Sequence, residues 1–171
     1  MSKFTESEEF KKGHSFEISL SGILKENGTF VLPCYENTGE KQDKAPKMYG
    51  EYKGLVLPDL FICNNGRSSW IECKVKASPT VCTKKGYPKG RLEHGIPLRL
   101  YNDYMEVQKV SGLKVWLFLL EESSGEILYN TLDALSIQEG PDRIKIYENN
   151  KMSYGGMIFF SRRIFKIYRK L

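Results

Sequence analysis

The stretch LPDLFICNNGRSSWIECKV, residues 57–75, contains the pattern that decides the fold. Two apolar runs, 60–63 and 70–75, flank the turn-forming sequence Asn-Asn-Gly at 64–66. Asn and Gly tolerate positive φ, which a tight turn between two antiparallel strands requires. The stretch therefore predicts a β-hairpin whose second strand carries the triplet Glu-Cys-Lys.

Side chains alternate between the two faces of a strand, so Glu72 and Lys74 are predicted to share one face with Trp70. The other face is apolar, with Ile71, Cys73 and Val75. If the two runs pair, Asp59 approaches Glu72 at one end of the sheet. The sequence therefore predicts two carboxylates and one ammonium group on a common face.

This grouping has a chemical use. Two carboxylates can hold Mg²⁺, which keeps several waters and binds substrate phosphate. A neighbouring lysine can orient a metal-bound water or stabilise charge on the reacting phosphate, so the set suits phosphodiester hydrolysis. The alternative is a Glu–Lys pair on the solvated face of a hairpin, because the spacing E-x-K is common on its own.

Pro58-Asp59 followed by Glu72-Cys73-Lys74 resembles the signature of the PD-(D/E)XK nuclease superfamily. Residues 13–28 read G-x-x-F-E-x-x-L-x-x-x-L-x-x-x-G. That segment is similar to the first helix of archaeal-type Holliday junction resolvases and related phage nucleases, in which the glutamate completes the acidic cluster. The resemblance covers about residues 13–120 and implies the superfamily's αβββαβ core.

The resemblance also implies roles for individual residues. Asp59, Glu72 and the backbone carbonyl of Cys73 would coordinate Mg²⁺ or Mn²⁺, and Glu17 would contribute directly or through a metal-bound water. Lys74 would position the attacking water. The implied function is a metal-dependent DNA endonuclease that cuts junction, flap or duplex DNA, and the resemblance leaves a homodimer open.

With 171 residues, 40% of them apolar, the chain is long enough for one domain with a substantial core. We expect a single α/β domain, 1–171, with a central mixed sheet flanked by helices and a C-terminal extension, 121–171. The net charge of +5 permits a nucleic-acid partner. No apolar run approaches the ~18 residues of a membrane span, and the first residues lack a secretory core, so we expect a cytoplasmic setting without a membrane partner.

Four cysteines, at 34, 63, 73 and 82, have no C-x-x-C or C-x-x-H spacing. A zinc knuckle is therefore not indicated, and the spacing does not match an iron–sulfur cluster. We expect Cys34, Cys63 and Cys73 to be reduced, buried thiols in apolar strands.

The segment 76–96 is basic, is broken by Gly and Pro, and contains one acid, Glu93. A basic loop that follows the E-x-K strand is where a phosphate backbone would be held, although such a loop can also serve solubility alone. The basic tail, 161–171, could add a phosphate contact or a dimer surface, or be a charged final helix or strand. The predicted nucleic-acid contacts in the first segment are Lys76, Lys84, Lys85, Lys89, Arg91 and His94.

Periodicity and turn signals predict the remaining elements. Leu100 and Tyr104 occupy the spacing at which exonuclease-like nucleases of this superfamily carry Q-x-x-x-Y, so the missing glutamine disfavours a processive exonuclease. Helices are expected over 5–25, 97–111 and 132–138, strands over 29–32, 115–120, 126–129 and 157–160, and loops over 36–54 and 139–156.

Two other function classes stay open. One is a non-catalytic nucleic-acid-binding domain that kept the nuclease fold; intact Asp59, Glu72 and Lys74 argue against it, and a magnesium titration separates the two. The other is an interaction domain without a nucleic-acid role, which would bind no DNA in a salt-dependent way.

Overall fold

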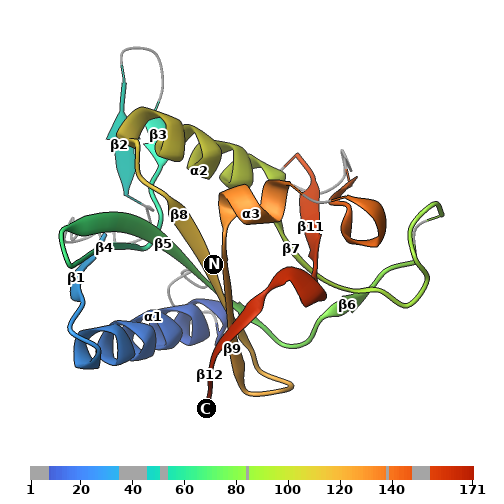
Figure 1. The fold of residues 1–171 in the computed structure, drawn as a ribbon, viewed down its shortest axis with the longest axis horizontal. Coiled ribbons are helices and arrows are strands. Elements are labelled where there is room, and N and C mark those ends of the chain that lie inside the picture. Colours follow the sequence, from blue (N-terminus) through green and yellow to red (C-terminus); the bar gives the residue numbers. More distant parts are fainter. Residues whose placement is uncertain (1–7, 35–45, 51–53, 84, 138, 148–154) are drawn as a thin grey trace, which may run out of the picture.

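The computed structural model describes residues 8–34, 46–50, 54–83, 85–137, 139–147 and 155–171. In this part of the chain, helices α1 and α2 lie on opposite sides of a mixed β-sheet (Figure 1). In chain order the elements are α1 Glu8–Glu26, β1 Phe30–Pro33, β2 Lys47–Tyr49, β3 Gly54–Val56, β4 Leu60–Asn64, β5 Arg67–Lys76, β6 Thr80–Val81, β7 Leu92–Pro97, α2 Leu98–Ser111, β8 Val115–Glu121, β9 Glu126–Thr131, α3 Leu132–Ser136, η2 Gly140–Asp142, β10 Lys145–Tyr147, β11 Met157–Ser161, η3 Arg162–Ile164 and β12 Lys166–Lys170.

The main sheet has the strand order β1-β4-β5-β8-β9-β12. Strands β5 and β8 are parallel, and the other neighbours are antiparallel, which confirms the predicted mixed sheet. The predicted hairpin is β4–β5. Its turn depends on positive φ at Asn65 (48°) and Gly66 (72°), as the Asn-Asn-Gly sequence indicated.

Each face of the sheet carries its own apolar core. Under α1, Ile71 and Cys73 of β5 pack with Phe16 and Leu20. On the α2 face, Trp70 of β5 packs with Leu117, Leu119, Tyr104 and Val107. The continuous apolar run of β8 is therefore buried on both faces, as expected of a central strand.

A second sheet, of order β10-β11-β7-β6, lies beside α2, and Ile96, Ile158 and Phe160 join it to the core on that face. The prediction that 76–96 is a loop was therefore wrong over β6 and β7. The prediction of a loop over 139–156 was wrong at β10, and Lys47–Tyr49 forms a strand where a loop was expected. Residues 35–45, 51–53 and 148–154 of these segments lie outside the described part.

The other expected elements are present with small shifts in their limits. The helix predicted over 97–111 is α2, and it ends at Gly112 with φ of 68°. The tail forms β12, an edge strand paired with β9. All four cysteines are free thiols; Cys73 and Cys82 are buried. No helix in the described ranges is long and apolar enough to cross a membrane.

Candidate active site

Asp59 lies just before β4 and opposite Glu72. The pair Leu60↔Ile71 ends the β4–β5 ladder, and one further step in the same register places the two acids opposite each other. The backbone N–H of Cys73 donates to Asp59 Oδ2 at 2.8 Å. The Asp59 carbonyl accepts from Cys34 N–H at 2.8 Å, so the backbone of Asp59 is held as well as its side chain.

Glu72 and Lys74 share the α2 face of β5, as the alternation predicted. Glu72 is only 1% exposed, and the Lys74 side chain, 28% exposed, forms an ion pair with it through Nζ and Glu72 Oε1. Asp59 is close enough to Glu72 that its negative charge raises the pKa of the Glu72 carboxyl group. The structure thus brings together two carboxylates and one ammonium group.

Charge is unbalanced at this site. Burial raises the pKa of Glu72 to about 8, and the negative charge of Asp59 adds to that shift against the opposing effect of Lys74. Burial lowers the pKa of Lys74, but Glu72 and Asp59 raise it by more, so Lys74 stays cationic. Two buried or half-buried carboxylates with one ammonium group favour the binding of a further cation.

Tyr104 of α2 is the residue at this site whose role sequence reasoning missed. It is 2% exposed, and its hydroxyl interacts with the Glu72 carboxylate. Burial raises the pKa of Tyr104, and the charges of Glu72 and Asp59 raise it further, so its hydroxyl is protonated. Its position four residues after Leu100, in the Q-x-x-x-Y spacing, was the signal that could have found it.

Glu17 occupies a different position. It extends from α1, which packs on the Cys73 face of β5, whereas Glu72 points to the α2 face. The Glu17 side chain is 13% exposed, and Oε2 lies 3.5 Å from His14 Nδ1. Within the described ranges, no three His, Cys, Asp or Glu side chains are close enough to share an ion. The structure therefore does not bring Glu17 into a three-residue ligand set, and its contribution through a bound water stays a prediction.

The residues present fit a hard divalent cation. Magnesium is commonly bound by one or two carboxylates, with waters and substrate phosphate completing the shell. Asp59 and Glu72 supply oxygen ligands only, and neither Glu72 oxygen accepts a hydrogen bond of normal geometry from the described residues. Each carboxylate oxygen has two lone pairs, so Glu72 can bind a cation in addition to its ion pair with Lys74. The carbonyl of Cys73 stays a predicted additional ligand.

The predicted nucleic-acid contacts divide into three groups. Lys85 and Lys89 are exposed, and Lys76 is half-buried with a pKa that burial lowers. Lys84 lies outside the described residues. The prediction was wrong for His94, which is 2% exposed and bound through Nε2 to Glu121 Oε2 at 2.8 Å.

Arg91 is also buried, which the prediction of an exposed loop residue missed. Its Nε donates to Glu93 Oε1 at 3.0 Å, and its Nη1 donates to the carbonyl of Arg143 at 2.8 Å. The reason is that β7 is an interior strand of the second sheet, so the charges at its start must be paired.

Comparison with known proteins gives structural matches only. Neither a protein-family model nor a curated protein matches the chain. Among solved structures, Hjc, a Holliday junction resolvase from the archaeal hyperthermophile Archaeoglobus fulgidus, superposes with a TM-score of 0.52 at 12% sequence identity. The match covers 90% of this chain and 87% of the resolvase. The chain has the fold of the PD-(D/E)XK nucleases.

A second solved structure, D212, a nuclease from a fusselovirus, matches at 15% identity over 98% of this chain and 89% of its own, with a TM-score of 0.48. The match to the resolvase confirms, for the fold, the resemblance expected from Pro58-Asp59 and Glu72-Cys73-Lys74. At these identities the likeness concerns the fold, and the activity has to be argued from the site.

Proposed function

We propose that this chain is a nuclease that hydrolyses phosphodiester bonds of DNA with Mg²⁺ or Mn²⁺ as cofactor. One observation carries the proposal: the Asp59 carboxylate is bound to the backbone of the strand that presents Glu72 and Lys74, through the 2.8 Å bond from Cys73 N–H. The shared fold with a junction resolvase supports it.

In this proposal, the protein's residues hold and orient the reactants. Asp59 and Glu72 bind the cation, which when bound polarises the phosphate and lowers the pKa of a coordinated water. Because Lys74 stays protonated beside Glu72, it donates hydrogen bonds that orient the attacking water and stabilise negative charge on the phosphate. Tyr104, on α2, fixes the Glu72 carboxylate from the core side.

The substrate class follows from charge and fold. The chain carries a net charge of +5, which favours a polyanion, and its structural relative is named as a Holliday junction resolvase. We therefore propose DNA as the partner, with four-way junctions as the first substrate to test and a homodimer as the assembly to look for.

A panel assay tests the function. The purified full chain is incubated with Mg²⁺ or Mn²⁺ and single-stranded, duplex, flap or four-way DNA, and the products are sized. We expect cleavage by the wild type, no cleavage in excess EDTA, and none by folded Asp59→Asn. A wild-type protein that binds DNA but cuts no member of the panel would point instead to a non-catalytic nucleic-acid-binding domain.

A further inference from the structure

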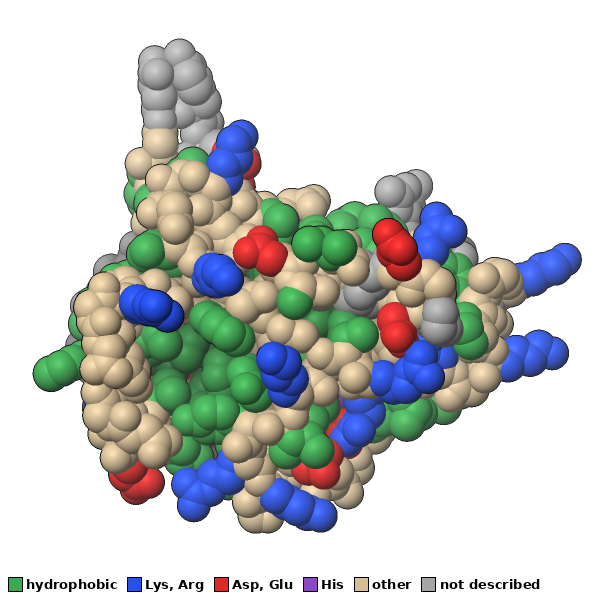
Figure 2. All heavy atoms as spheres, in the orientation of Figure 1, with side chains coloured by type: hydrophobic (Ala, Val, Ile, Leu, Met, Phe, Trp, Pro, Cys, Tyr) green, Lys and Arg blue, Asp and Glu red, His purple; other side chains and the backbone are tan. Residues whose placement is uncertain are grey.

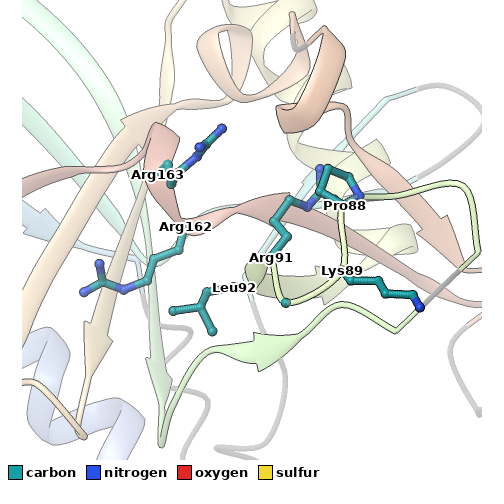
Figure 3. A pocket seen from close by; sticks show the side chains of 7 residues that line it. Pro88, Lys89, Arg91, Leu92, Arg162 and Arg163 are labelled. Carbon is teal, nitrogen blue, oxygen red and sulfur yellow. The ribbon is translucent and has the colours of Figure 1, made fainter.

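A cavity of about 340 Å³ opens between the start of β7 and the turn η3 (Figure 3). Four of its seven lining residues are Lys or Arg and none is acidic. Figure 2 shows Lys and Arg side chains gathered over the part of the molecule where β6, β7 and the segment between them project. The lining residues, hereafter the basic pocket, are Pro88, Lys89, Gly90, Arg91, Leu92, Arg162 and Arg163.

Each arginine of the pocket is paired with an acid: Arg162 with Glu121 and Glu126, Arg91 with Glu93, and Arg163 with Asp142. Arg162 Nε donates to Glu121 Oε2 at 2.8 Å, and Glu121 is 2% exposed. Arg91 pairs with Glu93, which is fully buried. Each pair fixes a guanidinium group in place, and a fixed guanidinium group suits phosphate recognition because little side-chain freedom is lost on binding.

Two further cations stand at the outer margin. The Arg163 side chain is 66% exposed and donates three hydrogen bonds to the Asp142 carboxylate, at 3.0–3.3 Å, and Lys89 is exposed. Figure 3 shows Arg91 and Arg162 on either side of Leu92, with the Arg162 guanidinium group and the Lys89 side chain extending in opposite directions. The pocket therefore has rigid arginines inside and two accessible cations outside, which fits a phosphate group that remains part of a longer chain.

The basic pocket lies toward the same face and end of the main sheet as the candidate active site. Glu72 pairs with Leu117 and Lys76 with Glu121 in the parallel ladder β5–β8, so Glu121 is four residues further along β8. An even number of residues keeps the side chains on one face, and four residues span about 13 Å. Because Glu121 holds Arg162, the pocket begins about this far along the sheet from Glu72.

We propose that the basic pocket binds a phosphate of the nucleic-acid backbone at a distance from the bond that is cut. The proposal rests on the proposed function for its substrate class. Such a contact carries no sequence information; it fixes the position of the strand relative to Asp59 and Glu72.

Binding is measured by fluorescence anisotropy with the full chain and a labelled duplex oligonucleotide in EDTA, so that no cleavage is needed. The test variants are Lys89→Ala, Arg163→Ala and the double variant, whose side chains are exposed, so the fold is expected to survive. The matched controls are Lys11→Ala on α1 and Arg67→Ala at the start of β5, both exposed cations away from the pocket. Thermal unfolding confirms that each variant is folded.

We expect the double variant to bind about tenfold more weakly at low salt. Its salt slope should be smaller by about 0.9 for each phosphate that the protein no longer neutralises. The controls should bind like the wild type. Equal binding by the double variant and the wild type would overturn the proposal. So would competition by inorganic phosphate as strong as that by unlabelled oligonucleotide, since that would identify a free-phosphate site.

This result is separate from the test of catalysis. If the wild type cuts DNA but the pocket variants bind normally, the pocket proposal fails alone. If the variants bind DNA more weakly but the wild type cuts nothing, the proposed function fails and the pocket remains a nucleic-acid contact.

Discussion

Two of the clusters of buried charge in the described part of the molecule shift the pKa of a glutamate in opposite directions. At the β4–β5 site, Asp59 and Glu72 face one ammonium group, and burial raises the pKa of Glu72 to about 8. At the end of β8, Glu121 accepts from Arg162 and contacts His94, and the pKa of Glu121 falls to about 2 chiefly through the Arg162 hydrogen bond. Arg162 also pairs with Glu126 at 2.6 Å, and these contacts join the two sheets. In the cluster around Glu72, burial outweighs the pairing with Lys74, and a bound cation would offset that cost.

The largest expected effect is on cleavage. Replacing Asp59, Glu72 or Lys74 by Ala removes a cation ligand or the group that orients the water, so cleavage should fall by about 10³-fold or more. The measurement is initial rate on the preferred DNA with Mg²⁺ or Mn²⁺, alongside circular dichroism. Wild-type rates in any one folded variant would remove that residue from the mechanism.

The cluster around Glu121 should instead govern stability in acid. The pKa of Glu121 is lower in the folded protein than its ordinary value of 4.5, so its contribution is present above pH 4.5 and is lost as the pH falls toward 2. That contribution is about 3 kcal/mol. The free energy of unfolding is measured in urea at pH 7 and at pH 3. It should fall more for the wild type than for Glu121→Gln, whose value at pH 7 is already lower. Equal losses of stability in the wild type and in Glu121→Gln would show that Glu121 is not the titrating group.

The stability contribution of the cluster around Glu72 should change with pH in the opposite direction. The pKa of Glu72 is raised in the folded protein, so without metal its ionisation lowers stability as the pH rises from 4.5 through about 8. Glu72→Gln removes the free-energy cost of ionising this buried carboxyl group, so it should raise the free energy of unfolding by about 1 kcal/mol in EDTA at pH 8. Urea unfolding in EDTA measures it. A clear loss of stability would place Glu72 among the structural ion pairs.

The smallest effect is expected at Tyr104. Tyr104→Phe keeps the buried ring and removes the hydroxyl that interacts with Glu72, so the fold should persist while kcat falls by about tenfold or less. Steady-state kinetics with saturating metal gives kcat and KM separately. A change in KM for DNA with kcat intact would assign Tyr104 to substrate binding instead.

The hairpin and its site were predictable because they depend on local rules. Alternation along β5 places Glu72 and Lys74 together, and Asn65 and Gly66 set the turn that brings Asp59 opposite Glu72. The second sheet was not predictable in this way. Strand β7 carries Glu93 and His94, which looked like loop residues because their partners, Lys145 and Glu121, are distant in the sequence.

Glu17 shows the same limit at the site itself. A one-dimensional motif places it in the acidic cluster, but which sheet face α1 covers depends on the packing of Phe16 and Leu20 against Ile71 and Cys73. The contact of Tyr104 with Glu72 was not predictable for a related reason, since only the position of α2 over the Glu72 face gives the Tyr104 hydroxyl a partner.

The central claim is that Asp59 and Glu72 together hold one divalent cation, and calorimetric titration of the metal-free protein with Mn²⁺ tests it directly. We expect one site in the wild type, loss of that site in Asp59→Asn and in Glu72→Gln, and an unchanged site in Glu121→Gln. Absence of heat from the wild type, or an unchanged site in either of the first two variants, would contradict the account.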